Sequence, residues 1–206
     1  SPNAALPGPK ASRESIAEAK IPVITVSDGP SKKAFYKKNA EGKQVVNMPD
    51  EQGFFVLVSD PMIGARREFL DATEMALFNS DVIRLLAATG AFRVVQRELD
   101  AVIEALKAGE TPGMPTMTIT TEKAVAAGEF SNPYAGAKAY AALKIAESVA
   151  AVTTEGCFVE QDPGNYVPLV AAAHEMMRAA ARLADEAREM EKQNDGVLRT
   201  PYAANG

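Results

Sequence analysis

The stretch LVAAAHEMMRAAARLADEAREM, residues 169–190, carries the clearest periodic pattern in the chain. Its small and bulky apolar residues alternate at steps of four and three, which predicts one face of a long α-helix that packs along a neighbour. Such an alternation lets two helices approach closely, because small side chains reduce the distance between helix axes. We define the helix seam as Leu169, Ala173, Met176, Ala180, Leu183, Ala187 and Met190.

A matching stripe lies in the preceding predicted helix, residues 133–151. Its members repeat the same steps and are Ala135, Ala139, Ala142, Ala146 and Val149. We therefore expect the two helices to pair antiparallel through their alanine faces. Two explanations stay open: packing within one chain, which is the more common use of such a seam, and contact between subunits.

The N-terminal third of the chain carries β-strand signals. Apolar and β-branched residues indicate strands over 21–28 and 54–60, and the turn NAEG, residues 39–42, predicts a tight hairpin between them. We expect these strands to follow one another as an antiparallel meander. The segments ITVSDGP and VLVSDPM end alike in Ser-Asp, which we interpret as two similar strand ends rather than a domain-sized repeat.

The rest of the chain is predicted to be mostly helical. A short helix is expected over 11–20 within the N-terminal arm. Further helices are expected over 61–78, 80–89, 91–108, 121–127, 133–151 and 165–192, with a break at Gly90. The fold class is therefore α+β: an N-terminal antiparallel β-meander or hairpin followed by a mostly helical, alanine-rich C-terminal part. The expected divisions are an extended arm (1–20), the meander with helices (21–108), a proline-rich connector (109–120), a helical part (121–192) and a tail (193–206).

Composition excludes several classes of protein. The formal net charge is -5, which argues against a general nucleic-acid coat or a polybasic membrane binder. No apolar run has the length of a membrane-spanning helix, and the first ten residues lack the apolar stretch of a signal peptide. Cys157 is the single cysteine, so an internal disulfide is excluded. We expect a location in the cytoplasm or in a large particle such as a virion, without embedding in a membrane.

Catalytic motifs are scarce. His174 is the only histidine, and HEMMR begins like a zinc-binding helix but has Arg178 where a second histidine must stand. Cys157, in an apolar setting, is expected to be a buried, inert thiol. No glycine-rich phosphate loop is present, and we expect no catalytic residue, no metal and no cofactor. A nucleophile and base brought together only by the fold remain open.

A lysine-rich stretch, SKKAFYKKNAEGK at residues 31–43, carries a net charge of +4 against -9 in the remainder of the chain. The candidates for contact with a partner are Lys32, Lys33, Phe35, Tyr36, Lys37, Lys38, Lys43, Arg66 and Arg67. The lysines could protect a sheet edge, dock on an acidic protein such as a second copy, or bind single-stranded nucleic acid.

These patterns favour a non-enzymatic structural or assembly protein that self-associates within an oligomeric complex, such as a virion component. The alternative hypothesis is a nucleic-acid-binding accessory protein that uses the lysine-rich hairpin; nucleic acid is the less favoured partner.

Overall fold

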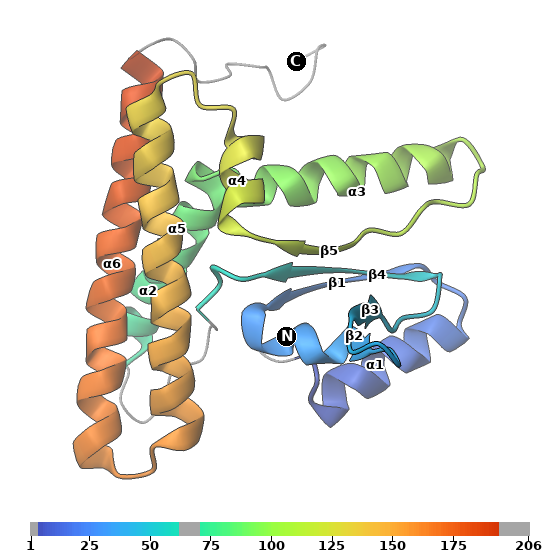
Figure 1. Cartoon of the computed structure of the whole chain (residues 1–206), viewed down its shortest axis with the longest axis horizontal. Coiled ribbons are helices and arrows are strands. Elements are labelled where there is room, and N and C mark those ends of the chain that lie inside the picture. Colours follow the sequence, from blue (N-terminus) through green and yellow to red (C-terminus); the bar gives the residue numbers. More distant parts are fainter. Residues whose placement is uncertain (1–3, 62–70, 194–206) are drawn as a thin grey trace.

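The computed structural model describes residues 4–61 and 71–193, which form a small parallel sheet, a separate hairpin and a helical unit (Figure 1). The strands are β1 (Val23–Asp28), β2 (Tyr36–Lys38), β3 (Gln44–Val46), β4 (Gln52–Leu57) and β5 (Thr116–Ile119). The helices are α1 (Pro7–Glu18), α2 (Ala72–Ala88), α3 (Ala91–Lys107), α4 (Thr121–Gly128), α5 (Pro133–Thr154) and α6 (Pro163–Gln193). A 3₁₀ segment, η1 (Gly29–Ala34), and a π-helical turn, η2 (Glu155–Val159), complete the list. The mixture of helix and sheet agrees with an α+β fold.

The main sheet is parallel, so the predicted antiparallel meander is wrong. β4 lies in the centre, and β1 and β5 each pair with it in parallel. All six residues of β4 are buried, as is typical of a strand covered on both faces in a parallel sheet. The connection from Gly29 to Glu51 makes this possible, because it is long enough to return the chain to the start of a parallel neighbour.

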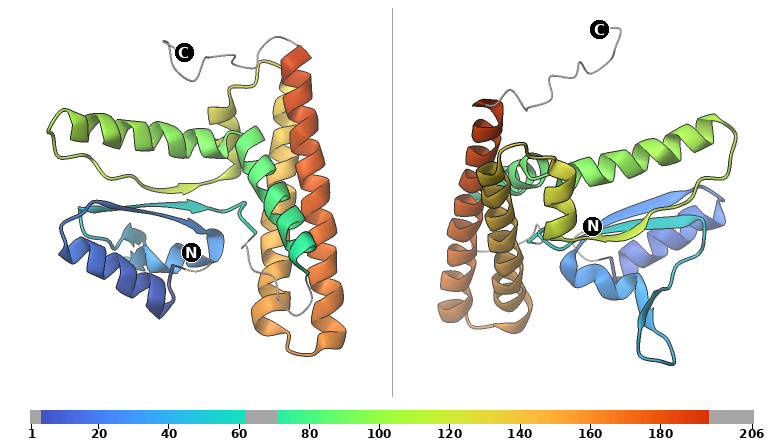
Figure 2. Two further views of the ribbon diagram at one scale, coloured as in Figure 1. Left: turned by 180° about the vertical axis from the view of Figure 1, so that it is seen from behind. Right: turned by 45° about the horizontal axis from the view of Figure 1, so that its top comes forward.

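The hairpin itself is confirmed as an antiparallel pair, β2–β3, that belongs to neither edge of the main sheet (Figure 2). Gly42 has φ 78°, and its N–H donates to the carbonyl of Asn39 over 3.0 Å. The side chain of Asn39 accepts from the N–H groups of Glu41 and Lys43, at 3.1 and 2.9 Å. The predicted turn residues therefore adopt the backbone conformation and the hydrogen bonds that such residues prefer in turns.

Two differences from the predicted helices have local causes. α1 spans residues 7–18, which confirms the short helix expected over 11–20 but starts it within the segment expected to be extended, because proline at the first helical positions is compatible with a helix start. α2 is one continuous helix, begun by Asp71, whose side chain accepts from the N–H of Glu74 over 2.7 Å. Gly90, with φ 93°, separates α2 from α3 as predicted. The predicted tail, apart from Gln193, and the first three residues of the arm lie outside the described residues.

α5 and α6 pack side by side as an antiparallel pair, as the alanine stripes predict (Figure 1). Ala173, Ala180 and Ala187 of the helix seam are fully buried. The four bulky members of the seam, Leu169, Met176, Leu183 and Met190, are only half-buried. The bulky residues one position further along the helix are deeply buried instead, with Val170 and Met177 at 0 % exposure. η2 links the two helices.

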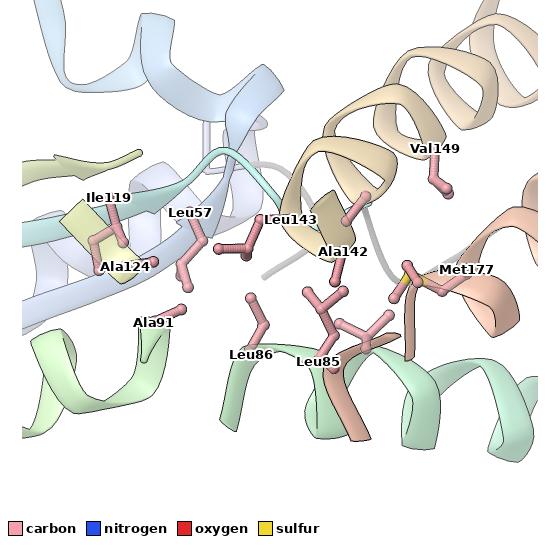
Figure 3. Close-up of a cluster of buried hydrophobic side chains, with 14 of the residues drawn as sticks. Leu57, Leu85, Leu86, Ala91, Ile119, Ala124, Ala142, Leu143, Val149 and Met177 are labelled. Atoms are coloured by element: carbon pink, nitrogen blue, oxygen red, sulfur yellow. The ribbon is translucent and has the colours of Figure 1, made fainter. Parts of the chain in front are cut away.

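The two faces of the sheet pack on different clusters. Phe55 and Leu57 of β4 face the large core formed with α2, α5 and α6, part of which Figure 3 shows. Phe54 and Val56 alternate with them and face a small cluster with Phe35. The helical unit therefore covers one side of the sheet, and the η1 segment with the hairpin covers the other.

Candidate functional site

The carboxyl ends of the three parallel strands point toward the α5–α6 pair (Figure 1). In register, Asp28 at the end of β1 lies beside Leu57, and Leu57 lies beside Ile119 of β5. Ligands of open parallel sheets commonly bind beyond these ends, where loops and helix starts meet. We call this region the carboxyl edge and define it by Asp28, Ser31, Ser59 and Pro61.

Asp28 is the most unusual group at the carboxyl edge. It is 2 % exposed, and its Oδ1 accepts from the N–H and the hydroxyl of Ser31, at 3.0 and 2.6 Å. Its Oδ2 is buried without a hydrogen-bond partner among the described residues. Burial raises the pKa of this carboxyl, against the lowering effect of the Ser31 hydrogen bonds. A buried carboxyl with one unoccupied oxygen can accept a donor from a ligand or carry a proton.

The contacts of Ser31 extend this arrangement. Its hydroxyl oxygen accepts from the N–H of Ala4 over 3.0 Å, and both residues are 0 % exposed. Asp28 therefore ties two segments to the end of β1: the η1 turn directly, and the chain at Ala4 through Ser31.

The end of β4 is anchored to the helical unit. The hydroxyl of Thr153 on α5 donates to the carbonyl of Pro61 over 2.8 Å, and Ser59 is 4 % exposed. The following residues, 62–70, lie outside the described part of the chain, and they include the candidates Arg66 and Arg67. Asp71, the first described residue after this segment, caps α2.

His174 fixes the start of α2 to α6. Its Nδ1 lies 3.1 Å from Oε1 of Glu74, which also accepts from Arg178 over 3.3 Å. Its ring stacks on Phe78 with 4.3 Å between ring centroids. Nε2 is buried without a partner among the residues that the structure describes. His174 is thus a buried link between α2 and α6.

The structure distributes the lysine-rich candidates over several environments. Lys37 and Lys38 are exposed on β2. Nζ of Lys43 lies 3.2 Å from Oε2 of Glu41. Lys32 lies over the ring of Tyr36, 5.5 Å from its centroid. Lys33 is exposed at the end of η1.

Of the two aromatic candidates, Phe35 is buried and Tyr36 is half-buried. The hydroxyl of Tyr36 lies 3.3 Å from that of Thr118 on β5. Phe35 is 0 % exposed, so its ring is not accessible to a partner in this conformation. Cys157, expected to be buried, is half-buried in η2.

Two hollows are lined by described residues other than those that define the carboxyl edge. One, of about 550 Å³, lies between α1, the end of η1 and the loop before β4. The other, of about 330 Å³, lies between α3, α4 and β5. Within residues 4–61 and 71–193, no group of three or more histidine, cysteine, aspartate or glutamate side chains is arranged to hold a metal ion. In the same ranges, no helix combines the length and apolar character needed to cross a membrane.

Comparison with known proteins places this geometry in context. The profile of the family described as methylene-5,6,7,8-tetrahydromethanopterin dehydrogenase matches residues 1–206. An F420-dependent methylenetetrahydromethanopterin dehydrogenase of Archaeoglobus fulgidus is 59% identical over 206 residues, which cover 100% of this chain and 71% of the relative. The enzyme of the same name from Methanothermobacter marburgensis is 51% identical over 208 residues, with coverage of 100% and 71%.

A solved structure shares the fold. It is an F420-dependent methylene-tetrahydromethanopterin dehydrogenase in complex with methylene-tetrahydromethanopterin and coenzyme F420. The TM-score is 0.85 at 50% sequence identity, and the match covers 98% of this chain and 69% of that chain.

These matches correct the functional prediction. The hypothesis of a non-enzymatic structural protein or virion component is wrong, because relatives matching the whole chain are named as dehydrogenases. The same finding overturns the nucleic-acid-binding alternative. The two Ser-Asp endings noted in the sequence lie toward one edge of the sheet, because Ser27 and Asp28 end β1, Ser59 and Asp60 follow β4, and the two strands are parallel neighbours.

Proposed function

The chain belongs to the methylene-5,6,7,8-tetrahydromethanopterin dehydrogenase family, and from this premise we propose that it is an oxidoreductase that acts on methylenetetrahydromethanopterin with coenzyme F420. The observation that carries the proposal is the 59% identity over the whole chain to a dehydrogenase of that name. Coenzyme F420, when bound, supplies the acceptor for the hydride that leaves the methylene group of the substrate. The residues of this chain bind, orient and shield the reacting groups.

The carboxyl edge is the proposed binding region. A pterin ring carries N–H donors, and Oδ2 of Asp28 is a buried acceptor without a partner among the described residues, so the donor and acceptor types fit. Because Asp28 is 2 % exposed, a ligand reaches Oδ2 only after a small shift of η1. Ser31 lies on η1, so its hydrogen bonds to Oδ1 couple that shift to Asp28, while Oδ2 is the oxygen left to orient the ligand.

The helical unit has a positioning role in this proposal. The carbonyl of Pro61 accepts a hydrogen bond from Thr153, and the carboxylate of Glu74 contacts His174. Hydrogen bonds therefore link the chain to α5 before residues 62–70 and to α6 after them. These attachments fix where the chain leaves the sheet and where α2 begins. A rigid scaffold of this kind is what catalysis needs, because small misplacements of reacting groups reduce the rate strongly.

The test is an assay of coenzyme F420 reduction by the purified chain with methylenetetrahydromethanopterin. Asp28→Asn is the informative variant, because the amide oxygen can still accept from Ser31 while an N–H₂ group replaces Oδ2. We expect kcat/KM to fall about tenfold or more, the effect of losing one charge-assisted hydrogen bond. Asp100→Asn, a matched change at an exposed position on α3, should leave the rate unchanged.

Two results would count against these assignments. Absence of any F420 reduction by the folded chain would refute the assigned activity. Full activity of Asp28→Asn would remove Asp28 from the site while leaving the activity itself intact.

We also propose that the enzyme self-associates through the exposed lysines of the hairpin. Lys37 and Lys38 lie on β2, away from the large core, and the rest of the chain carries a net charge of -9. Charge reversal of both lysines to glutamate should therefore lower the mass measured by light scattering at low salt. A mass equal to one chain for the unaltered protein would contradict self-association.

A further inference from the structure

The hollow of about 550 Å³ is lined by an unusual set of charges for an acidic chain. Among the described lining residues, Lys10 and Arg13 of α1 and Lys33 of η1 contribute three cations, against the one carboxylate of Glu14. Gln52, which begins β4, also lines the hollow, so it lies at the opposite end of that strand from the carboxyl edge. None of the described residues that line the hollow defines the carboxyl edge, although one of them, Ala4, donates to Ser31 of that edge over 3.0 Å.

Arg13 is held in a defined orientation. Its guanidinium carbon lies 5.6 Å from the ring centroid of Phe35. Phe35 is fully buried and stacks on Phe54, with 4.5 Å between centroids and 9° between ring planes. An arginine held over an aromatic ring keeps its in-plane N–H donors available for a carboxylate or phosphate.

Arg13 also has an unmet hydrogen-bonding requirement. Its Nη1 is buried without a partner among the described residues. Burial lowers the pKa of Arg13, while the carboxylate of Glu14 acts in the opposite direction. A buried N–H group that has lost water without gaining a partner is unfavourable, and an anion in the hollow would remove this cost.

The two lysines contribute positive charge but do not fix the orientation of a bound anion. The ammonium of Lys10 lies 3.7 Å from the carboxylate of Glu14, and both side chains are more than half exposed. Such an exposed pair contributes little to stability and can be exchanged for another anion at small cost. Lys33, on η1, also lines the hollow. A ligand between them would therefore be surrounded by positive charge.

We propose that this hollow is a binding site for an oxyanion, a phosphate or carboxylate group, with Arg13 as the hydrogen-bonding anchor and Lys10 and Lys33 as supporting charges. The anion could be free, or it could be the charged part of a larger organic molecule such as a coenzyme. This inference adds a second site to the proposed enzyme and does not depend on the carboxyl edge.

The test is isothermal titration calorimetry of the purified chain with inorganic pyrophosphate, and separately with citrate, at constant ionic strength. We expect saturable binding that Arg13→Gln weakens about tenfold, because a charge-assisted hydrogen bond is lost. Lys33→Gln should weaken binding less, about threefold, since it removes one charge at a more open position. Lys38→Gln is the matched control, an exposed lysine outside the hollow, and should bind as the unaltered chain does.

A second measurement distinguishes the two sources of the anion. If the hollow holds part of the coenzyme, Arg13→Gln raises the KM for coenzyme F420 as well; if it holds a free anion, only pyrophosphate or citrate binding changes. Arg13→Lys retains the charge without the planar fork and guards against misfolding of the glutamine variant; it should bind with intermediate affinity. Unchanged affinity in Arg13→Gln, equal losses in Lys38→Gln, or no saturable binding of either anion would overturn the proposal.

Discussion

Two adjacent methionines on α6 provide a direct test of how that helix packs. Met177 is 0 % exposed in the large core, whereas Met176 is half-buried at its margin. Replacement of either by alanine changes the same atoms and the intrinsic helix propensity by the same amount, so those contributions cancel in the comparison. The difference in stability between Met177→Ala and Met176→Ala therefore measures burial and the space left behind.

The expected magnitudes follow from the burial of each side chain. Removal of a fully buried methionine side chain costs about 3 kcal/mol, because the lost transfer energy is increased by the cavity that remains. At the half-buried position the loss is about 1 kcal/mol, since the site can relax and admit solvent. The free energies of unfolding should thus differ by about 2 kcal/mol. For a chain of this length that corresponds to a difference in Tm of about 4–8 °C.

The assay is chemical denaturation followed by circular dichroism, with the slope of the transition compared between variants. Equal slopes mean that the midpoints report stability alone. Equal losses in the two variants, or a larger loss in Met176→Ala, would refute the packing of α6 described above and support the seam predicted from the sequence.

Two further predictions concern the backbone and the ionisation of Asp28. Gly90→Ala should lower the free energy of unfolding by more than about 3 kcal/mol, because φ is 93° and an added Cβ would lie 2.2 Å from the carbonyl oxygen of Ala124. Gly109→Ala, at φ 74° in open space, should lower it by only about 1 kcal/mol when both variants are measured by thermal unfolding. Burial raises the pKa of Asp28 above 3.8, so the native state binds this proton more tightly than the unfolded chain does, and stability is lost as the pH rises from about 3.8 through the native pKa. Asp28→Asn abolishes this titration, and its stability relative to the unaltered chain should improve over that range in denaturation series; a difference that stays constant with pH would contradict the assignment.

Local features of the fold were predictable because short-range interactions determine them. The turn at Asn39 and Gly42 and the helix break at Gly90 depend on the conformational preferences of those residues. Asn132 and Pro133 likewise specify the start of α5, since the asparagine side chain accepts from the N–H of Tyr134 over 2.9 Å.

The direction of strand pairing was not predictable in the same way. β1 and β4 are separated by η1 and the hairpin, and the apolar pattern of β1 does not distinguish an antiparallel neighbour from a parallel one. The complete burial of β4 was the available hint, since FFVL, residues 54–57, lacks the alternation of a strand with one solvated face.

The helix seam illustrates a second limit of periodicity. Ala173, Ala180 and Ala187 belong equally to a row completed by Met176 and Leu183 and to one completed by Met177 and Ala184. Both rows have steps of four and three, so spacing alone cannot choose between them. The choice depends on what α2 and the sheet place against α6, which is a tertiary contribution.

The candidate site was not found because its members have no fixed spacing in the sequence. Asp28 and Ser59 are brought to one edge only by the parallel pairing of β1 and β4, which was predicted incorrectly. The buried state of Asp28 and the contact of His174 with Glu74 on another helix also depend on the complete fold.

The position of the β2–β3 hairpin also bears on the order of folding events. It lies within the connection between β1 and β4, and it can close on a microsecond timescale because its strands are adjacent in sequence. Once closed, it shortens the effective loop that must be ordered before the parallel pair can form, and so reduces the entropic cost of that step. Weakening of the turn at Asn39 should therefore slow refolding while leaving the unfolding rate almost unchanged.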